Sequence, residues 1–286
     1  MSESTHNDAP AAEIYERPDD YDLEHEGDDS DARFYGRLLR RLHPARVLEF
    51  GCGSGRITLA LAAALPNAEI VGVDASRPML ERAARGLAPR TPRDRDRISY
   101  LEGDMREWTS PSAAFDVVVI AGRSASHLLT LDDRLRTWHN AFRLLRPGGA
   151  FILDVAMPDL ATLAESQRVW PRAQVEFDSY TSNGSNDGPR LLRCTATSYQ
   201  PHEQRADVRF FYDRFTQQDA DRFVGDFQSH IYFPSELELL FTVGGFTSAQ
   251  RYGDYSFGAF ARTSPYLITI AFRPEHAAAR RDALPA

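Results

Sequence analysis

The sequence contains no lysine, and all 33 of its basic residues are arginine. Without a lysine amine there is no Schiff base with pyridoxal phosphate or with a carbonyl substrate. The same absence excludes the Walker-A loop of P-loop nucleotide hydrolases, which requires a G-K-[ST] sequence. Cysteine is also scarce, because only Cys52 and Cys194 occur and no C-x-x-C is present. We therefore expect neither a disulfide framework nor a zinc site, and no metal at all.

Positive charge is in deficit, with a net charge of −8 and an isoelectric point near 5.5. A chain without basic runs is a poor partner for a nucleic-acid backbone. No apolar run approaches the roughly 20 residues that span a bilayer. The first 20 residues are polar and acidic and contain no apolar signal core. We expect a cytoplasmic protein that binds neither nucleic acid nor a membrane.

From Arg46 onward, short apolar strands alternate with amphipathic helices, a pattern typical of a parallel sheet covered on both faces. After Pro158 longer, half-polar strands separated by turns indicate an inserted antiparallel sheet. The predicted fold class is α/β, a Rossmann-like seven-stranded sheet with helices on both faces and an antiparallel β lid. The expected divisions are a disordered tail (1–14), a helical cap with an acidic loop-like first half (15–45), a cofactor-binding core (46–157), the lid (158–233), completion of the core (234–274) and a second tail (275–286).

The stretch "RVLEFGCGSGR" at residues 46–56 places glycines at 51, 53 and 55 after a buried strand. Such glycines let the backbone approach a ligand closely. A dinucleotide fingerprint would require a third glycine at position 56, which is Arg56. Glu49 precedes the loop and offers negative charge to a cationic ligand.

This G-x-G-x-G motif after an acid strongly resembles the first motif of the class I S-adenosylmethionine-dependent methyltransferases. Four later segments also match the family in order: "EIVGVD", "EGDMREW", "DVVVIAG" and "LLRPGGAFIL". The resemblance covers roughly residues 46–156 and implies S-adenosylmethionine as cofactor, with Asp74 on the ribose hydroxyls. The further cofactor-binding residues that it implies are Tyr15, Tyr21, Glu49, Gly51, Gly53, Gly55, Ala75, Asp104, Met105 and Ala121.

The segment "AGRSASHLL" is similar to a cleft-lining stretch of glycine and sarcosine N-methyltransferases, although Arg123 replaces an asparagine. The N-terminal tyrosines resemble those that fold over the cofactor in that group. If the acceptor must lose a proton, a general base is required. The candidate catalytic residues are His127, His230, Asp226 and Glu24. Aromatic residues in and near the lid are candidates for the substrate pocket, namely Tyr180, Phe211 and Tyr255.

The resemblance implies methyl transfer to a small-molecule acceptor of bacterial specialised metabolism. The whole chain is similar to enzymes that methylate indole C3 in tryptophan-containing cyclic dipeptides. N-methylation of an amine, such as an amino sugar or amino acid, is the alternative. A module that binds S-adenosylmethionine without catalysis is a different class, and a dehydrogenase is a third. We expect an aromatic or amine small-molecule partner, and a homodimer is compatible with the sequence.

Overall fold

The computed structural model describes residues 13–111, 114–165, 174–181 and 188–275. They divide into two compact units, Met1–Asp28 with Asp159–Ser229 (unit 1) and Asp29–Pro158 with His230–Ala286 (unit 2). The cap expected at 15–45 is thereby divided, because only its first part groups with the antiparallel sheet. The tail expected at 1–14 and the tail expected from 275 lie almost entirely outside the described residues.

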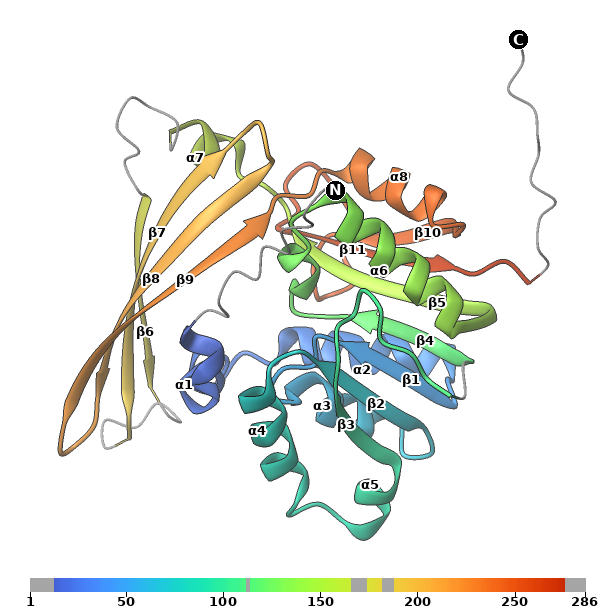
Figure 1. The fold of residues 1–286 in the computed structure, drawn as a ribbon, viewed down its shortest axis with the longest axis horizontal. Coiled ribbons are helices and arrows are strands. Elements are labelled where there is room, and N and C mark those ends of the chain that lie inside the picture. The colour runs from blue at the N-terminus through green and yellow to red at the C-terminus, as the bar shows by residue number, and fades with distance from the viewer. Residues whose placement is uncertain (1–12, 112–113, 166–173, 182–187, 276–286) are drawn as a thin grey trace, which may run out of the picture. The chain divides into compact units, whose positions relative to one another are not determined.

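Unit 2 contains a seven-stranded sheet in the order β10-β11-β5-β4-β1-β2-β3 (Figure 1). Strands β3, β2, β1, β4 and β5 pair in parallel, and β11 runs antiparallel to both β5 and β10. This arrangement confirms the predicted α/β class. The strands are β1 (Arg46–Phe50), β2 (Glu69–Asp74), β3 (Ile98–Glu102), β4 (Phe115–Ile120), β5 (Leu145–Ala156), β10 (Thr247–Tyr252) and β11 (Tyr266–Phe272).

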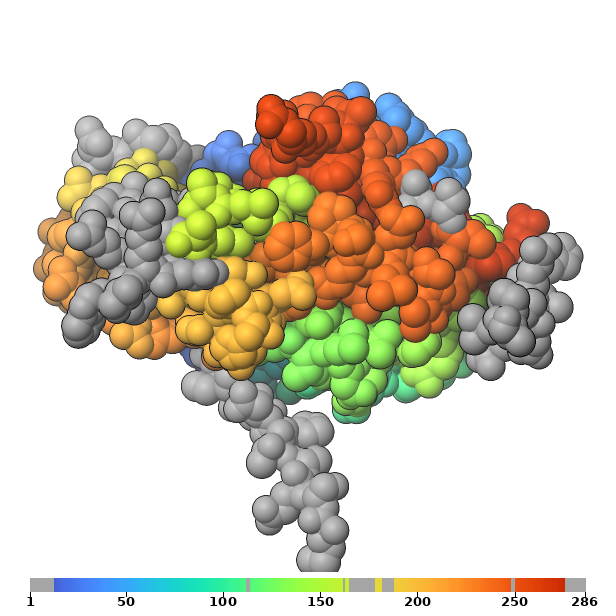
Figure 2. Space-filling view, turned by 90° about the horizontal axis from the view of Figure 1, so that it is seen from above, coloured from blue at the N-terminus to red at the C-terminus, as the bar shows by residue number. Residues whose placement is uncertain are grey.

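Helices cover both faces of this sheet because alternate strand residues enter two separate cores. One core packs the strands against α6 and α8, with Trp138 fully buried at its centre. The other packs them against α2 and α3. Figure 2 shows the orange surface around α8 bordering the green surface of the α6 region. The helices are α2 (Ser30–Leu42), α3 (Arg56–Ala64), α4 (Arg77–Leu87), α5 (Pro92–Arg97), the 3-10 helix η2 (Ser124–His127), α6 (Leu131–Leu144) and α8 (Pro234–Val243).

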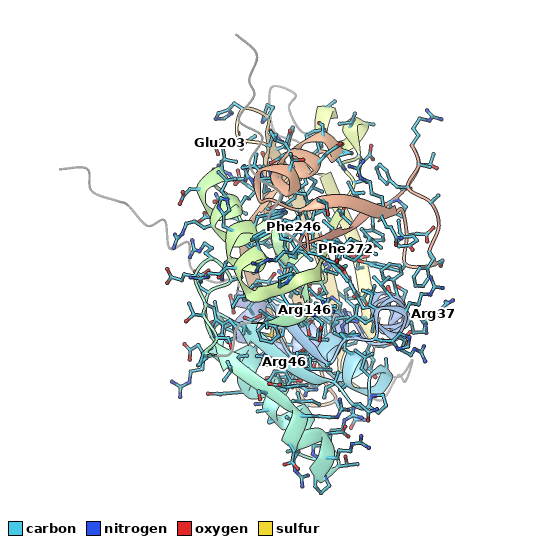
Figure 3. The ribbon with its side chains drawn as sticks, turned by 90° about the vertical axis from the view of Figure 1, so that its right-hand side faces the viewer. Arg37, Arg46, Arg146, Glu203, Phe246 and Phe272 are labelled. Atoms are coloured by element: carbon cyan, nitrogen blue, oxygen red, sulfur yellow. The ribbon has the colours of Figure 1, made fainter. Side chains whose placement is uncertain are left out.

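Ion pairs join the strands at the amino-terminal edge of the parallel sheet. Arg46 donates from Nε to Glu69 (2.8 Å), and the Arg46 backbone N–H donates to Asp116 (2.8 Å). Arg146 forms a second ion pair with Asp116. Arg46 and Arg146 are labelled in Figure 3. This edge is therefore occupied by contacts within the protein, and the glycine loop follows β1 at the opposite, carboxyl edge.

Unit 1 contains a four-stranded antiparallel sheet in the order β6-β7-β8-β9 (Figure 1). The strands are β6 (Gln174–Thr181), β7 (Arg190–Gln200), β8 (Arg205–Phe215) and β9 (Ala220–His230), and the helical segments of the unit are η1 (Glu13–Glu16), α1 (Pro18–Glu24) and α7 (Leu160–Glu165). The antiparallel sheet predicted after Pro158 is therefore present, and its last strand, β9, has charged and small residues that interrupt the apolar alternation.

The acidic stretch that we expected to be loop-like forms the short helix α1. A seven-residue helix is not stable alone in water, so packing against a partner must hold it. Ile14 and Leu23 supply that packing in a core with Leu191, Tyr212 and Phe223. Ion pairs from α1 and the residue before it reach three strands in succession. They are Arg17 with Asp221 of β9 (2.7 Å), Asp20 with Arg214 of β8 (2.7 Å) and Glu24 with Arg193 of β7 (2.9 Å).

None of the helices in the described ranges combines the length and the apolarity that a membrane crossing requires. Within the same ranges, His, Cys, Asp and Glu side chains do not gather in threes in a way that could hold a metal ion.

Candidate functional site

The glycine loop turns sharply at the carboxyl end of β1. Gly51, Gly53 and Gly55 have φ values of +66°, +53° and +80°, a region that L-residues with a Cβ rarely adopt. The Gly53 N–H donates to Asp74 Oδ2 (2.7 Å), and the Gly51 N–H donates to the Val73 carbonyl (2.8 Å). The loop is therefore fastened to the end of β2, as a ligand-binding turn requires.

The glycines differ in what a side chain would meet. A Cβ at Gly51 would lie 2.8 Å from the Ser124 Cβ, and one at Gly55 would collide with the Tyr100 ring. At Gly53, however, a Cβ would meet no atom within 4 Å, and the same holds for Gly122 after β4. Because β1 and β4 are neighbours in the sheet, these two open positions lie at the same edge. The space beside them is where a ligand can approach the backbone closely.

Asp74 ends β2 with its carboxylate fixed by backbone groups. Oδ2 accepts from Gly53, and Oδ1 accepts the Ser76 N–H (2.8 Å). Burial raises the pKa of Asp74, while these backbone hydrogen bonds act in the opposite direction. Each oxygen retains a lone pair, so the carboxylate can still accept hydrogen bonds from hydroxyl groups of a ligand. Ala75 follows it and is exposed.

Glu49 lies inside the protein, 1% exposed, and accepts a hydrogen bond of 2.5 Å from the Thr58 hydroxyl. Burial raises its pKa to about 8. Glu49 was predicted to offer negative charge to a cationic ligand, and the structure places its carboxyl within the core beside Thr58. Arg56, which argued against a dinucleotide, donates two hydrogen bonds to Asp31 (2.7 and 2.6 Å) and ties α3 to α2.

Asp104 and Met105 follow β3, and Met105 lies near the loop, with its Cε 3.5 Å from where a Gly51 Cβ would stand. The Asp104 carboxylate accepts the Arg106 backbone N–H (2.8 Å) and also pairs with the Arg106 guanidinium. Although burial acts the other way, these hydrogen bonds hold the pKa of Asp104 below its usual value. Arg106 also donates to Asp133 (2.8 Å). The sequence analysis did not anticipate this arginine.

The segment after β4 carries Ala121, which is buried, and η2. Ser124 of η2 donates from Oγ to the Ala121 carbonyl (2.9 Å), and its Cβ lies beside Gly51. Arg123 has a left-handed φ of +65°, a strained state for a residue other than glycine. His127 ends η2 with an exposed side chain. This segment therefore brings a histidine to the same edge as the glycine loop.

A fully buried carboxylate supports the strained turn. Asp154 at the end of β5 accepts the Arg123 N–H (3.1 Å), the Tyr255 hydroxyl (2.8 Å) and the Tyr35 hydroxyl. Burial raises the pKa of Asp154, and the two tyrosine hydrogen bonds oppose that rise. Tyr255, a candidate for substrate contact, has a structural hydrogen bond here. Asp154 could have been predicted as a functional residue, because it is an acid inside the apolar run "FILDVA". No feature of the sequence distinguishes Tyr35 in this way.

A second buried network contacts the other end of the same segment. His230, only 3% exposed, lies with Nε2 2.8 Å from Glu236 Oε1, and Glu236 forms an ion pair with Arg134 (3.4 Å). Arg134 donates to the Leu128 and Leu129 carbonyls (3.1 and 2.9 Å). The structure therefore places His230, a candidate general base, in a buried network in which its Nε2 is engaged by Glu236.

The remaining candidate residues belong to unit 1. Tyr15 and Tyr21 pack on the aromatic core of the antiparallel sheet, with ring centroids 6.0 Å apart. Glu24 lies in the ion pair with Arg193, Tyr180 is half-buried on β6, and Phe211 is exposed on β8. Asp226 is exposed and receives two hydrogen bonds from Arg209 (2.6 and 2.8 Å). These bonds hold the pKa of Asp226 below its usual value, which makes it a poor general base.

Residues 47–149 match the protein family described as "Methyltransferase domain". This range contains the glycine loop, Asp74, Asp104 and η2, so the resemblance to class I S-adenosylmethionine-dependent methyltransferases is confirmed for this domain. The match covers the part of unit 2 in which the candidate site lies.

Three curated relatives align with parts of the chain. Putative methyltransferase YqeM of Bacillus subtilis is 36% identical over 110 residues, 38% of this chain and 42% of that protein. Cypemycin N-terminal methyltransferase of a Streptomyces species is 36% identical over 161 residues, 54% and 60%. Trans-aconitate 2-methyltransferase of Streptomyces avermitilis is 33% identical over 132 residues, 44% and 46%. The chain spans about half the length of these relatives.

Solved structures extend the likeness to both units. The CcbJ methyltransferase from Streptomyces caelestis is 22% identical with a TM-score of 0.68, over 85% of this chain and 90% of that chain. The sugar N-methyltransferase KedS8 from Streptoalloteichus is 18% identical with a TM-score of 0.68, over 96% and 98%. At such identities the likeness shows a shared fold.

Proposed function

We propose that this protein transfers a methyl group from S-adenosylmethionine to an amine nitrogen of a small molecule. The observation that carries the cofactor assignment is the loop Gly51–Gly55, fixed to Asp74 and open at Gly53. Position 56, where a dinucleotide fingerprint has its third glycine, is Arg56, and the sequence contains no lysine for a phosphate chain. An open backbone edge beside an oriented carboxylate instead suits a ribose and an amino-acid tail.

The residues that would hold the cofactor come from four strand ends. Gly51, Gly53 and Gly55 would lie along its amino-acid tail, Asp74 and Ala75 at the ribose, Asp104 and Met105 at the adenine, and Ala121 at the base of the pocket. Arg106 occupies much of the Asp104 carboxylate. An adenine amino group would therefore share Asp104 with this arginine or contact the neighbouring backbone.

When bound, S-adenosylmethionine supplies a methyl group already activated on a sulfonium, so the protein mainly aligns the acceptor and excludes water. An amine must give up a proton during methylation. Of the candidate bases, Asp226 is paired on the surface and His230 is buried, whereas His127 is exposed on η2. We assign His127 as the proton acceptor.

The names of related proteins favour an amine as the methyl acceptor. The cypemycin relative methylates an N-terminus by its name, and KedS8 is a sugar N-methyltransferase. The trans-aconitate 2-methyltransferases, which are named for a carboxylic acid, favour an acid as the acceptor instead. The indole C3 of a tryptophan cyclic dipeptide remains a second candidate, because Tyr15, Tyr21, Tyr180 and Phe210 border one aromatic core that could accept a flat ring.

Incubation of the full chain with S-adenosylmethionine and an acceptor panel tests this proposal. The panel comprises amino sugars, amino acids, trans-aconitate and tryptophan cyclic dipeptides, and mass spectrometry locates the added methyl group. Methylated amines are expected, and His127→Asn should lower kcat with little change in cofactor affinity. Cofactor binding without any methylated product would instead favour a non-catalytic binding module.

A further inference from the structure

The short helix η2 is too small to hold its own position. It has four residues, and a 3-10 helix of this length is not stable alone in water. Ala125 and Leu128, which are three residues apart, share one side of this turn and are buried, whereas His127 is exposed. The position of the His127 ring therefore depends on the contacts that hold the buried side of η2.

Two side chains from other elements bind backbone carbonyls on that buried side. Tyr232 Oη donates to the Ala125 carbonyl (2.9 Å), and Arg134 Nη1 of α6 donates to the Leu128 and Leu129 carbonyls (3.1 and 2.9 Å). Both Tyr232 and Arg134 are buried. Because burial raises the pKa of Tyr232, its hydroxyl keeps its proton and remains a donor. The backbone is therefore held on both sides of the histidine.

The two donors are themselves fixed by a buried charge network. Glu236 Oε1 lies 2.8 Å from His230 Nε2 and 3.4 Å from Arg134 Nε. The His230 ring packs edge-on against the Tyr232 ring, with centroids 4.6 Å apart. Apolar residues of similar volume often stabilise a core as well as a buried ion pair does, so stability alone does not account for this network. We call Tyr232, Arg134, Glu236 and His230 the η2 clamp.

The start of η2 contacts the glycine loop. The Ser124 Cβ lies 2.8 Å from where a Gly51 Cβ would stand, and the preceding Arg123 N–H donates to buried Asp154 (3.1 Å). The η2 clamp holds the other end of the same segment, and all of these residues belong to unit 2. The clamp therefore fixes where His127 lies relative to the loop at which the cofactor would bind.

We propose that Tyr232 and Arg134 are positioning residues for methyl transfer, because they hold η2 where His127 can accept the proton of the acceptor amine. The inference rests on the proposed function, since it takes His127 as the proton acceptor. The amine nitrogen forms the new bond to the methyl carbon, the electron pair of the broken carbon–sulfur bond stays on sulfur, and the amine proton passes to the imidazole. A shift of the ring by about 1 Å would lower the rate by up to roughly 100-fold.

Two substitutions remove the donors of the clamp. Tyr232→Phe keeps the ring and loses the hydroxyl, and Arg134→Met loses the guanidinium. With an amine that the wild type methylates, each variant should lower kcat about tenfold or more and leave the KM values of the amine and of S-adenosylmethionine within about twofold. Hydrogen–deuterium exchange of residues 121–129 in the free protein at pH 7 should become about fivefold faster or more. Tyr232→Phe serves alone should Arg134→Met fail to fold.

Arg273→Met is the matched control, because Arg273 also donates to two backbone carbonyls, at the other end of α6. It donates from Nη1 to the Phe142 and Leu145 carbonyls (2.9 and 2.6 Å). The segment between α6 and β5 lies at the amino edge of the parallel sheet, away from the glycine loop. Arg273→Met should therefore leave both kcat and the exchange of residues 121–129 unchanged.

A double-mutant cycle shows whether the clamp acts through the histidine. In a His127→Asn background, Tyr232→Phe should lower kcat by less than about twofold, because the group that it positions is already absent. The proposal is overturned if Tyr232→Phe lowers kcat as much in that background as in the wild type. It is also overturned if Tyr232→Phe keeps the wild-type kcat, or if residues 121–129 exchange no faster in Tyr232→Phe than in Arg273→Met.

The exchange measurement does not require turnover, so it separates the clamp from the proposed function. Faster exchange in Tyr232→Phe but not in Arg273→Met, in a protein that methylates no amine, would keep the positioning of η2 and reject the proposed function. Amine methylation with an unchanged kcat in Tyr232→Phe would do the reverse.

Discussion

Replacing Gly53 with alanine separates the ligand-binding role of the glycine loop from its role in folding. Gly53 has a φ of +53°, and a Cβ there would meet no atom within 4 Å. The added methyl group therefore costs only the left-handed backbone strain of an L-residue, about 1–2 kcal/mol. We expect the thermal midpoint to fall by about 2–4 °C for each kcal/mol in a chain of this size.

We expect the affinity for the cofactor to fall much more than the stability of the fold. If the open space beside Gly53 is where the ligand approaches, the new methyl group must be accommodated against the ligand at a cost of about 1–3 kcal/mol. That cost weakens binding roughly 5- to 150-fold, since about 1.4 kcal/mol corresponds to a factor of ten. Calorimetric titration with S-adenosylmethionine and with its demethylated product would measure the change directly.

Gly27 provides the matched control for this experiment. It has a φ of +89° and also meets no atom within 4 Å, but it lies in the turn after α1. Gly27→Ala should lose similar stability and keep the affinity of the wild type. The reasoning is refuted if Gly53→Ala binds within twofold of the wild type, or if both variants lose affinity equally.

Three further substitutions test the buried groups. Burial raises the pKa of Glu49 to about 8, so its contribution to stability is complete below about pH 4.5 and is lost as the pH rises through 8. Glu49→Gln should therefore remove a loss of about 4 kcal/mol between pH 5 and 9 in urea unfolding. A pH dependence equal to that of the wild type would contradict the assignment. Tyr35→Phe should destabilise the fold by about 1–3 kcal/mol, because Asp154 loses a buried donor, and an unchanged urea midpoint would contradict this. Glu236→Ala should lower the free energy of unfolding by about 2 kcal/mol or more, because buried His230 and Arg134 both lose their carboxylate partner. Asp226→Ala, which breaks an exposed ion pair, is the control and should cost less than about 1 kcal/mol. Equal losses of the two variants in chemical denaturation would contradict the prediction.

The elements that the sequence pattern predicted are those whose information is local. The parallel strands follow from continuous apolar runs, and the glycine loop follows from residues within a single turn. Helix α4 carries Pro78 in its first turn, a position that proline favours, and the Ser76 hydroxyl accepts the Met79 N–H as a cap. The positive φ at Gly51 and Gly53 is a conformation that glycine adopts readily. Local steric rules therefore sufficed for the framework of the site.

The contacts that hold η2 could not be predicted from the sequence, because they join residues that are far apart in the chain. Asp154 lies 119 residues from Tyr35 and 101 residues from Tyr255. No spacing rule links such residues, and a tyrosine in an amphipathic helix looks like ordinary core. His230 was predicted as a candidate base, and the structure pairs its Nε2 with Glu236, six residues further on in the first turn of α8.

The arginine-only composition also takes on a structural meaning. A guanidinium can donate to two acceptors in fixed directions, whereas a lysine ammonium acts as a point charge. Arg193 uses this property to join Glu24 to Asp178, and Arg106 uses it to join Asp104 to Asp133. In both cases one guanidinium bridges two carboxylates that come from different segments of the chain. A lysine ammonium has three donors and could also contact two carboxylates, but it lacks the planar fork that fixes the direction of each hydrogen bond. The geometry at both places therefore depends on arginine.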